Sequence, residues 1–135
     1  MINLADRKLP VFVDFAKGLA SLSKCKTSRK VGCIILTPDF TQVLSIGYNG
    51  QPADIERCQP ELDICGCIHA EANAIAKLTT ERSGLIMIQT LSPCKLCAGL
   101  TINTKRISTV LYLEKWKDTT GLDLLKEVGI DVHQI

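Results

Sequence analysis

Two short motifs bring together side chains that can hold a metal ion and move a proton. His69-Ala70-Glu71 supplies an imidazole and a carboxylate, and a Pro-Cys-x-x-Cys run supplies the thiols of Cys94 and Cys97. One histidine and two cysteines form a zinc ligand set whose fourth tetrahedral position is left for water, which zinc makes acidic near neutral pH. Glu71 can then act as the general base and acid that takes up a proton and returns it. The motifs therefore predict a hydrolytic zinc centre with three protein ligands and a catalytic carboxylate.

Length and composition predict one small domain. The chain has 135 residues, of which 46% are hydrophobic, so one buried core is possible and we expect a single domain over residues 1–135. No apolar run approaches the roughly 20 residues that cross a bilayer, and residues 1–7 lack a secretory pattern, so we expect no membrane contact and a cytoplasmic location. The net charge of +2 and the 4% of aromatic residues favour a small-molecule substrate over a nucleic acid.

Helix-like and strand-like stretches alternate, which is typical of a sheet covered by helices. A first helix is predicted from an apolar stripe at three- and four-residue spacings: Leu9, Phe12, Phe15, Leu19 and Leu22. Strands are expected at residues 31–37, 42–48, 85–90, 107–113 and 130–135. Further helices are expected from residue 67 or 68 to 79, from 92 to 104 and from 121 to 128. A hairpin turn is expected at Pro38-Asp39, and residues 49–64 are expected to form a polar loop.

Both metal motifs fall at predicted helix starts. Ser92 suits an N-cap and Pro93 the first helical position, so the helix that carries the two cysteines should begin there. The helix after His69 should turn a set of small and apolar residues toward the core: Ala72, Ile75, Ala76 and Leu78. Because helix N-termini stabilise anions, we expect them to lower the pKa values of the ligand thiols.

These motifs make the chain similar to the cytidine and deoxycytidylate deaminase superfamily, whose signature is H-x-E followed by P-C-x-x-C. Within the superfamily, the chain most resembles the deoxycytidylate (dCMP) deaminases. The matching segments are residues 23–25, 31–35, 47–50, 69–75 and 128–130. The resemblance implies a three-layer α/β/α sandwich with a mixed five-stranded sheet. It also implies hydrolysis of dCMP to dUMP and ammonia, with dCTP as a further candidate substrate, homo-oligomers such as hexamers, and control by dCTP and dTTP.

Other functions share the zinc motif and stay open. Deamination of tRNA adenosine or of free cytosine is one alternative, and a non-catalytic zinc-binding scaffold is another. A scaffold needs the three ligands but not the carboxylate, so the presence of Glu71 argues for catalysis. The balanced charge and the Gly47-Tyr48-Asn49-Gly50 segment favour a free nucleotide.

Five residues are candidates for substrate binding, Asn49 and Trp116 from the resemblance and the others from their place in the sequence. Asn49 would lie in the pocket wall, although a loop asparagine that tolerates a left-handed turn is the alternative. Asn73 would meet a phosphate or an effector, or else make a hydrogen bond at the helix surface. Lys24, Lys26, Arg29 and Lys30 form a basic cluster before the first strand. Lys26 or Arg29 would bind phosphate, unless this cluster is a solvated face. Trp116 stands where relatives commonly have tyrosine at the pocket rim, so it would stack there or pack as a loop aromatic.

The remaining cysteines suggest a second metal site. The chain has seven cysteines; Cys33 lies in an apolar run, where burial is the ordinary interpretation. The resemblance places four others in the regions that hold a structural zinc in some dCMP deaminases: Cys25, Cys58, Cys65 and Cys67. Such a site would pin the long polar loop and the start of the catalytic helix. Free or merely packed loop cysteines are the alternative.

Overall fold

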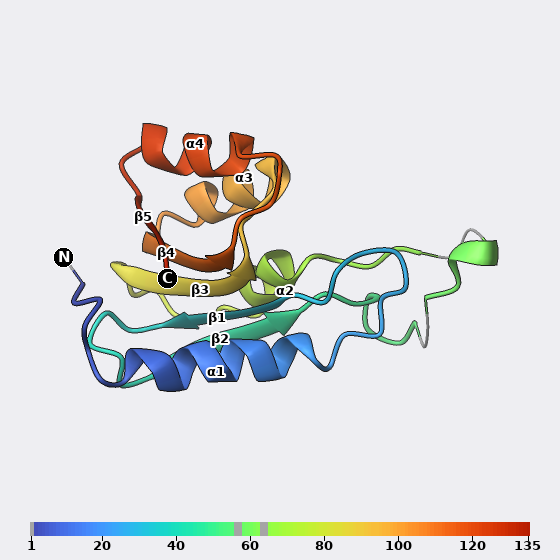
Figure 1. Cartoon of the computed structure of the whole chain (residues 1–135), viewed down its shortest axis with the longest axis horizontal. Coiled ribbons are helices and arrows are strands. Elements are labelled where there is room, and N and C mark those ends of the chain that lie inside the picture. Colours follow the sequence, from blue (N-terminus) through green and yellow to red (C-terminus); the bar gives the residue numbers. More distant parts are fainter. Residues whose placement is uncertain (1, 56–57, 63–64) are drawn as a thin grey trace.

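The computed structural model describes residues 2–55, 58–62 and 65–135 and confirms the predicted alternation of helices and strands (Figure 1). The elements in chain order are α1 (Leu9–Ala20), β1 (Gly32–Leu36), β2 (Val43–Tyr48), α2 (Ala70–Ala76), β3 (Leu85–Leu91), α3 (Lys95–Thr104), β4 (Ile107–Glu114), α4 (Thr120–Glu127) and β5 (Asp131–Gln134). A 3-10 turn, η1 (Pro60–Leu62), lies within the segment predicted as loop. Within the described ranges, no helix is both long and apolar enough to cross a bilayer.

The five strands form one mixed sheet in the order β2-β1-β3-β4-β5. Strand β1 runs antiparallel to β2 and to β3, whereas β3, β4 and β5 run parallel to one another. The β1–β2 pair is the predicted hairpin. The parallel pairs need crossover connections, which α3 and α4 supply. The mixed five-stranded sheet expected from the family resemblance is confirmed.

Alternate strand residues face two separate cores, so the fold has three layers (Figure 1). On one face, Ile34 and Ile88 belong to a cluster with Leu19 of α1. On the other face, Ile35 and Met87 belong to a cluster with residues of α2, α3 and α4. The helix on the first face supports the sheet, while the helices on the second face bring the two metal motifs together.

The apolar stripe of α1 differs from the prediction in two members. Phe15 and Leu22 are 40% and 54% exposed, and Leu22 lies beyond the end of the helix. Ala16 is fully buried instead. The helix approaches β1 so closely that a Cβ on Gly32 would meet the Ala16 carbonyl oxygen at 2.0 Å. Small residues permit this contact, and a pattern of large apolar residues does not reveal it.

The second helix is shorter than predicted, and only part of its predicted inward set meets the core: Leu78 is buried and Ile75 packs against the same cluster. The helix ends at Ala76, which is exposed, and Ala72 is only half-buried. The buried residues of α2 are Ala70, Glu71 and Ala74. The cause is close packing on β2, where a Cβ on Gly47 would meet the Ala70 carbonyl oxygen at 2.3 Å. This packing turns the face that carries Glu71 inward.

The third helix begins later than predicted. Cys94 is the N-cap and Lys95 is the first helical residue, in place of Ser92 and Pro93. The Ser92 hydroxyl oxygen accepts a hydrogen bond from the main-chain N–H of Trp116 at 2.7 Å instead. Ser92 therefore ties the β3–α3 turn to the loop after β4, and a ligand cysteine itself occupies the helix start.

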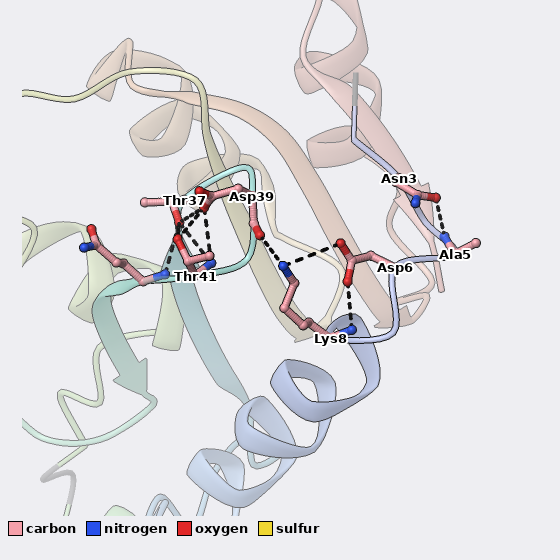
Figure 2. Close-up of polar contacts among 8 residues, drawn as sticks. Asn3, Ala5, Asp6, Lys8, Thr37, Asp39 and Thr41 are labelled. Atoms are coloured by element: carbon pink, nitrogen blue, oxygen red, sulfur yellow. Dashed lines mark hydrogen bonds and ion pairs between the residues drawn. The ribbon is translucent and has the colours of Figure 1, made fainter.

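Asp39 holds the turn between β1 and β2, as Figure 2 shows. Its Oδ1 accepts hydrogen bonds from the hydroxyls of Thr37 and Thr41 at 2.6 and 2.7 Å. These bonds lower the pKa of Asp39 to about 2. Lys8 donates from Nζ to the Asp39 carbonyl oxygen at 3.0 Å and lies 3.9 Å from the Asp6 carboxylate. The predicted hairpin turn is confirmed, and it is anchored to the start of α1.

Gln89 of β3 is fully buried, and neither its Nε2 nor its Oε1 has a hydrogen-bond partner among the described residues. A buried polar group without a partner costs about 1–3 kcal/mol of desolvation free energy. Gln89→Met keeps the length of the side chain and removes the amide. We expect it to raise the free energy of unfolding by about 1–2 kcal/mol in urea denaturation. An unchanged or lower unfolding midpoint would contradict this expectation.

Candidate active site

The three predicted metal ligands meet where two helices begin. His69 is the N-cap of α2 and Cys94 is the N-cap of α3, with Cys97 in the first turn. The Nδ1 atom of His69 lies 3.5 Å from Cys94 Sγ and 3.3 Å from Cys97 Sγ. All three ligand atoms lie within 4.8 Å of one another. The imidazole and the two thiols that the sequence predicts as ligands therefore lie close together.

These distances fit a tetrahedral zinc ion. With Zn–S near 2.3 Å and Zn–N near 2.05 Å, tetrahedral geometry separates sulfur and nitrogen by about 3.6 Å. The observed separations of 3.5 and 3.3 Å lie close to this value. The donor chemistry also fits, because three protein ligands with one open position are typical of catalytic zinc. The residues present can therefore hold the ion that the motifs indicate.

Glu71 lies two residues after the histidine ligand and is only 4% exposed. Burial raises the pKa of its carboxyl group, while the nearby His69 and a hydrogen bond with the Cys97 side chain act in the opposite direction. A carboxyl group with a raised pKa holds a proton more readily than a solvated one, which suits a group that must receive and return protons. Glu71 thus has the position and the environment that a proton carrier needs.

The sequence led us to expect that the start of α3 lowers the pKa values of the Cys94 and Cys97 thiols. The main-chain N–H of Cys97 donates to Cys94 Sγ at 3.4 Å, as an N-terminal amide should. Burial, followed by the Glu71 and Cys94 side chains, nevertheless raises the pKa of the Cys97 thiol. Desolvation and neighbouring negative charge act at Cys97 in the direction opposite to the expected effect of the helix start. A cation held by the ligands is what favours the thiolate.

A cavity of about 320 Å³ opens beside these groups, a volume within the range of small-molecule sites. Its walls come from the loop before β1, the end of β2, the start of α2, the β3–α3 turn and the loop after β4. The lining residues are Thr27, Ser28, Arg29, Val31, Asn49, His69, Ala70, Glu71, Leu91, Ser92, Cys94 and Trp116. Glu71 and two of the predicted metal ligands, His69 and Cys94, therefore border the same space as three of the five predicted substrate residues.

Asn49 lies in the cavity wall and is 2% exposed. Its Oδ1 accepts from the Val31 N–H at 2.8 Å, and its Nδ2 donates to Ser28 Oγ at 3.0 Å and to the Arg29 carbonyl oxygen at 2.8 Å. Asn49 is not among the non-glycine residues with positive φ, so the left-handed-turn alternative is wrong. The amide instead ties the loop before β1 to the end of β2.

The other predicted substrate residues divide into two groups. Arg29 and Trp116 line the cavity, whereas Lys26 and Asn73 are not among the lining residues. The Asn73 amide donates to the carbonyl oxygens of Tyr48 and Ile68 at 2.9 and 3.4 Å. That is the hydrogen bond at the helix surface that the sequence left as the alternative.

Arg29 is the one lysine or arginine among the described residues that line the cavity. Its guanidinium pairs with the carboxylate of Glu114 at the end of β4. Both side chains are more than half exposed, so the pair is solvated and can exchange partners. Sequence reasoning missed Glu114, because the pairing depends on where β4 ends relative to the loop before β1.

Thr27 and Ser28 are further wall residues that sequence reasoning missed. They stand between Lys26 and Arg29, and the basic residues drew attention to charge rather than to the two hydroxyls. Both hydroxyls contact cysteine sulfur: Thr27 Oγ1 lies 3.3 Å from Cys25 Sγ, and Ser28 donates to the same sulfur at 3.3 Å. The available signal in the sequence was the pair of hydroxyl residues between Cys25 and the first strand.

The four cysteines proposed as a second ligand set also come together. The sulfurs of Cys25, Cys58, Cys65 and Cys67, called here the four-cysteine cluster, all lie within 4.8 Å of one another. Tetrahedral zinc separates two thiolate sulfurs by about 3.8 Å. The cluster has the donor chemistry of a closed structural site, and it draws together the loop before β1, the long polar segment and the approach to α2.

Hydrogen bonds around the four-cysteine cluster favour thiolates at part of it. Burial raises the pKa of Cys25, but hydrogen bonds from Ser28, Thr27 and Cys67 together lower it to about 5. A hydrogen bond from Thr27 lowers the pKa of Cys65. Burial and the neighbouring thiols raise the pKa of Cys67. In metal sites, hydrogen bonds from neighbouring groups commonly orient the ligands. The hydroxyl-to-sulfur hydrogen bonds seen here are of that kind.

Comparisons with known proteins agree with this geometry. Residues 7–114 match the sequence model of the cytidine and deoxycytidylate deaminase zinc-binding region. The chain is 31% identical to deoxycytidylate deaminase of Saccharomyces cerevisiae over 138 residues, which cover 91% of this chain and 43% of the relative. The enzyme of the same name from Schizosaccharomyces pombe is 30% identical over 140 residues, which cover 91% of this chain and 42% of the relative. The chain thus spans less than half the length of these curated relatives.

Solved structures match over nearly the whole chain. The dCMP deaminase from the cyanophage S-TIM5, solved in complex with dCMP and dUMP, is 25% identical with a TM-score of 0.85. The match covers 98% of this chain and 100% of that chain. Because the family model matches well over half of the sequence, the chain belongs to the cytidine and deoxycytidylate deaminase family.

Proposed function

We propose that the protein deaminates a deoxycytidine nucleotide by zinc-dependent hydrolysis, with dCMP as the substrate and dUMP and ammonia as the products. The observation that carries the proposal is the buried carboxylate of Glu71 beside the His69, Cys94 and Cys97 ligands, facing a cavity of nucleotide-compatible size. Similarity to dCMP deaminases of two yeasts and a cyanophage supports the choice of substrate.

The three ligands would hold zinc, which when bound acidifies water near neutral pH. Glu71 takes a proton from the attacking water on its carboxylate and gives it to ring nitrogen N3 of cytosine. The second water proton passes by the same carboxylate to the amino group, and the bond from C4 to that nitrogen breaks to release ammonia. C4 keeps the water oxygen as the carbonyl of uracil, so one water is consumed for each ammonia formed.

The cavity wall supplies contacts for the rest of the nucleotide. Asn49 and Trp116 line the space where a base or sugar would lie, with the indole able to stack on the pyrimidine. We assign the 5′-phosphate to Arg29, since the guanidinium offers paired donors for phosphate oxygens and needs only to leave a solvated partner.

Arg29→Ala should raise KM for dCMP about tenfold to a hundredfold, the range for losing a hydrogen bond to a charged group. Activity on deoxycytidine, which has no phosphate, should change little. Lys26→Ala removes an equal charge outside the lining residues and serves as the matched control. Steady-state ammonia release measures both. Equal effects of Arg29→Ala on dCMP and deoxycytidine would assign Arg29 to another role.

A substrate panel tests the function itself. Ammonia release should be fastest from dCMP among dCMP, dCTP, deoxycytidine, cytosine and tRNA. Turnover of tRNA or of cytosine alone would establish one of the alternative deaminase activities. No turnover of any substrate by zinc-loaded protein would support the scaffold alternative.

We also propose that the four-cysteine cluster binds a second, structural zinc. The convergence of four sulfurs within 4.8 Å supports a closed tetrahedral site, which would offset the ordering entropy of the long polar segment. The alternative of unrelated loop cysteines does not account for the hydroxyl contacts from Thr27 and Ser28.

Assembly and regulation complete the proposal. We infer homo-oligomers, with a hexamer as the expected form, control by dCTP and dTTP, a single domain over residues 1–135 and a cytoplasmic location. Exposed apolar side chains on α3, Leu96 and Leu100 at 71% and 38%, provide surface for association between copies. Light scattering would measure the assembly, and dCMP kinetics with added dCTP or dTTP would measure the control.

A further inference from the structure

A chain of hydrogen bonds joins the four-cysteine cluster to the cavity wall. The Val31 N–H donates to Asn49 Oδ1, which fixes the orientation of the amide. Asn49 Nδ2 must then donate to Ser28 Oγ, at 3.0 Å. The Ser28 hydroxyl in turn donates to Cys25 Sγ, at 3.3 Å. The second N–H of the Asn49 amide goes to the Arg29 carbonyl oxygen at 2.8 Å, and the chain of donors ends on the Cys25 sulfur.

The loop that carries Ser28 has further contacts to the same sulfurs. Thr27 Oγ1 lies 3.0 Å from Cys65 Sγ, and the main-chain N–H of Lys26 hydrogen-bonds to Cys58. Three consecutive residues therefore face three different cysteines. The loop wraps the cluster on one side and lines the cavity on the other, so its position depends on the cluster keeping its shape.

Asn49 and Arg29 are the wall residues held by this arrangement. Asn49 is bonded to Ser28 Oγ and to the Arg29 carbonyl oxygen through one nitrogen. If the Ser28 hydroxyl is lost, one N–H of the Asn49 amide loses its acceptor. The amide then holds the loop through the Arg29 carbonyl oxygen and the Val31 N–H alone. The change leaves His69, Cys94, Cys97 and Glu71 untouched, because the described hydrogen bonds of the Ser28 hydroxyl are with Asn49 and Cys25 alone.

We propose that Ser28 is a positioning residue that joins the four-cysteine cluster to Asn49 and so sets the affinity of the cavity for its nucleotide. The proposal rests on the function assigned to this cavity. It assigns the cluster a role in substrate binding, in addition to holding the loop. It also places the effect on KM rather than on kcat, because Ser28 acts through the wall and not on the reacting atoms.

Ser28→Ala removes the hydroxyl, and Ser28→Thr keeps it. We expect Ser28→Ala to raise KM for dCMP about tenfold, the loss of one hydrogen bond to a charged or strongly polar partner, with kcat within twofold of the parent. Ser28→Thr should restore most of the affinity. Ser21→Ala, which removes an exposed hydroxyl at the end of α1, is the matched control and should match the parent.

Hydrogen exchange gives a readout that does not depend on turnover. The Val31 amide is protected by Asn49 Oδ1, so Ser28→Ala should speed exchange in peptides covering residues 26–31 while zinc content by mass spectrometry stays at the parental value. Parental KM and parental exchange in Ser28→Ala would overturn the proposal, as would a fall in kcat at constant KM. If the parent fails to deaminate dCMP, the proposed function fails, whereas the exchange comparison still tests the link.

Discussion

Replacement of Glu71 by glutamine is expected to lower kcat for dCMP about a thousandfold, the middle of the range for removal of a general acid and base. Glutamine keeps the size and hydrogen-bonding shape of the side chain but cannot carry the proton. KM should change little, because the substrate contacts assigned to the cavity wall are left in place. Ammonia release under saturating dCMP measures the effect.

The controls for Glu71→Gln separate catalysis from metal binding. Zinc content per chain should equal that of the parent, since the three ligands remain, and Glu61→Gln on the exposed turn η1 should keep parental kcat. A Glu71→Gln protein that retains zinc and turns over dCMP at the parental rate would remove Glu71 from the mechanism. Loss of zinc in this variant would instead make the carboxylate part of the metal site.

Replacement of Cys58 by alanine should remove one of two zinc ions per chain and strongly destabilise the fold. Cys58 is 2% exposed and belongs to the four-cysteine cluster but not to the cavity lining. A ligand present at a thousand times its dissociation constant contributes about 4 kcal/mol of stability, so a loss of at least this size is expected. Metal analysis and denaturant unfolding measure the two effects.

Cys33→Ala is the matched control for Cys58→Ala. Cys33 is a fully buried cysteine of β1 outside both ligand sets, so its replacement should leave two zinc ions per chain. Its cost in stability should come from lost packing alone and should not depend on a chelator. A fully loaded parent with one zinc ion per chain would exclude the second metal site.

The chemistry of the site could be predicted from the sequence because it depends on residue type and short spacing. A histidine two positions before a glutamate and two cysteines three positions apart are the residue types and spacings of the family's zinc-binding motif, and the fold brings them together. The order of helices and strands was also predictable, since alternating and three-to-four-residue periodicities record which side of each element meets the core. The mixed sheet and the three layers follow from that order and from the family resemblance.

The sequence predicted the buried residues of α1 and α2 incorrectly where these helices pack on the sheet through main-chain contacts. Ala16 replaces Phe15 in the buried stripe of α1, and Ala70, Glu71 and Ala74 join the predicted inward residues at α2, because Gly32 and Gly47 let helices approach the sheet closely. Such contacts depend on pairs of small residues far apart in the sequence. A pattern within one element does not contain them.

The sequence by itself determined the zinc-binding motif of the family and the alternation of helices and strands, because these depend on residue types and spacings within short segments. Only the tertiary structure decided that Ser28 and Thr27 face cysteine sulfur, that Arg29 pairs with Glu114 and that Asn73 clamps the main chain. The physical reason is that hydrogen bonds and ion pairs require distances of a few ångströms between segments that lie up to 85 positions apart along the chain. Such distances are set by how the helices pack on the sheet.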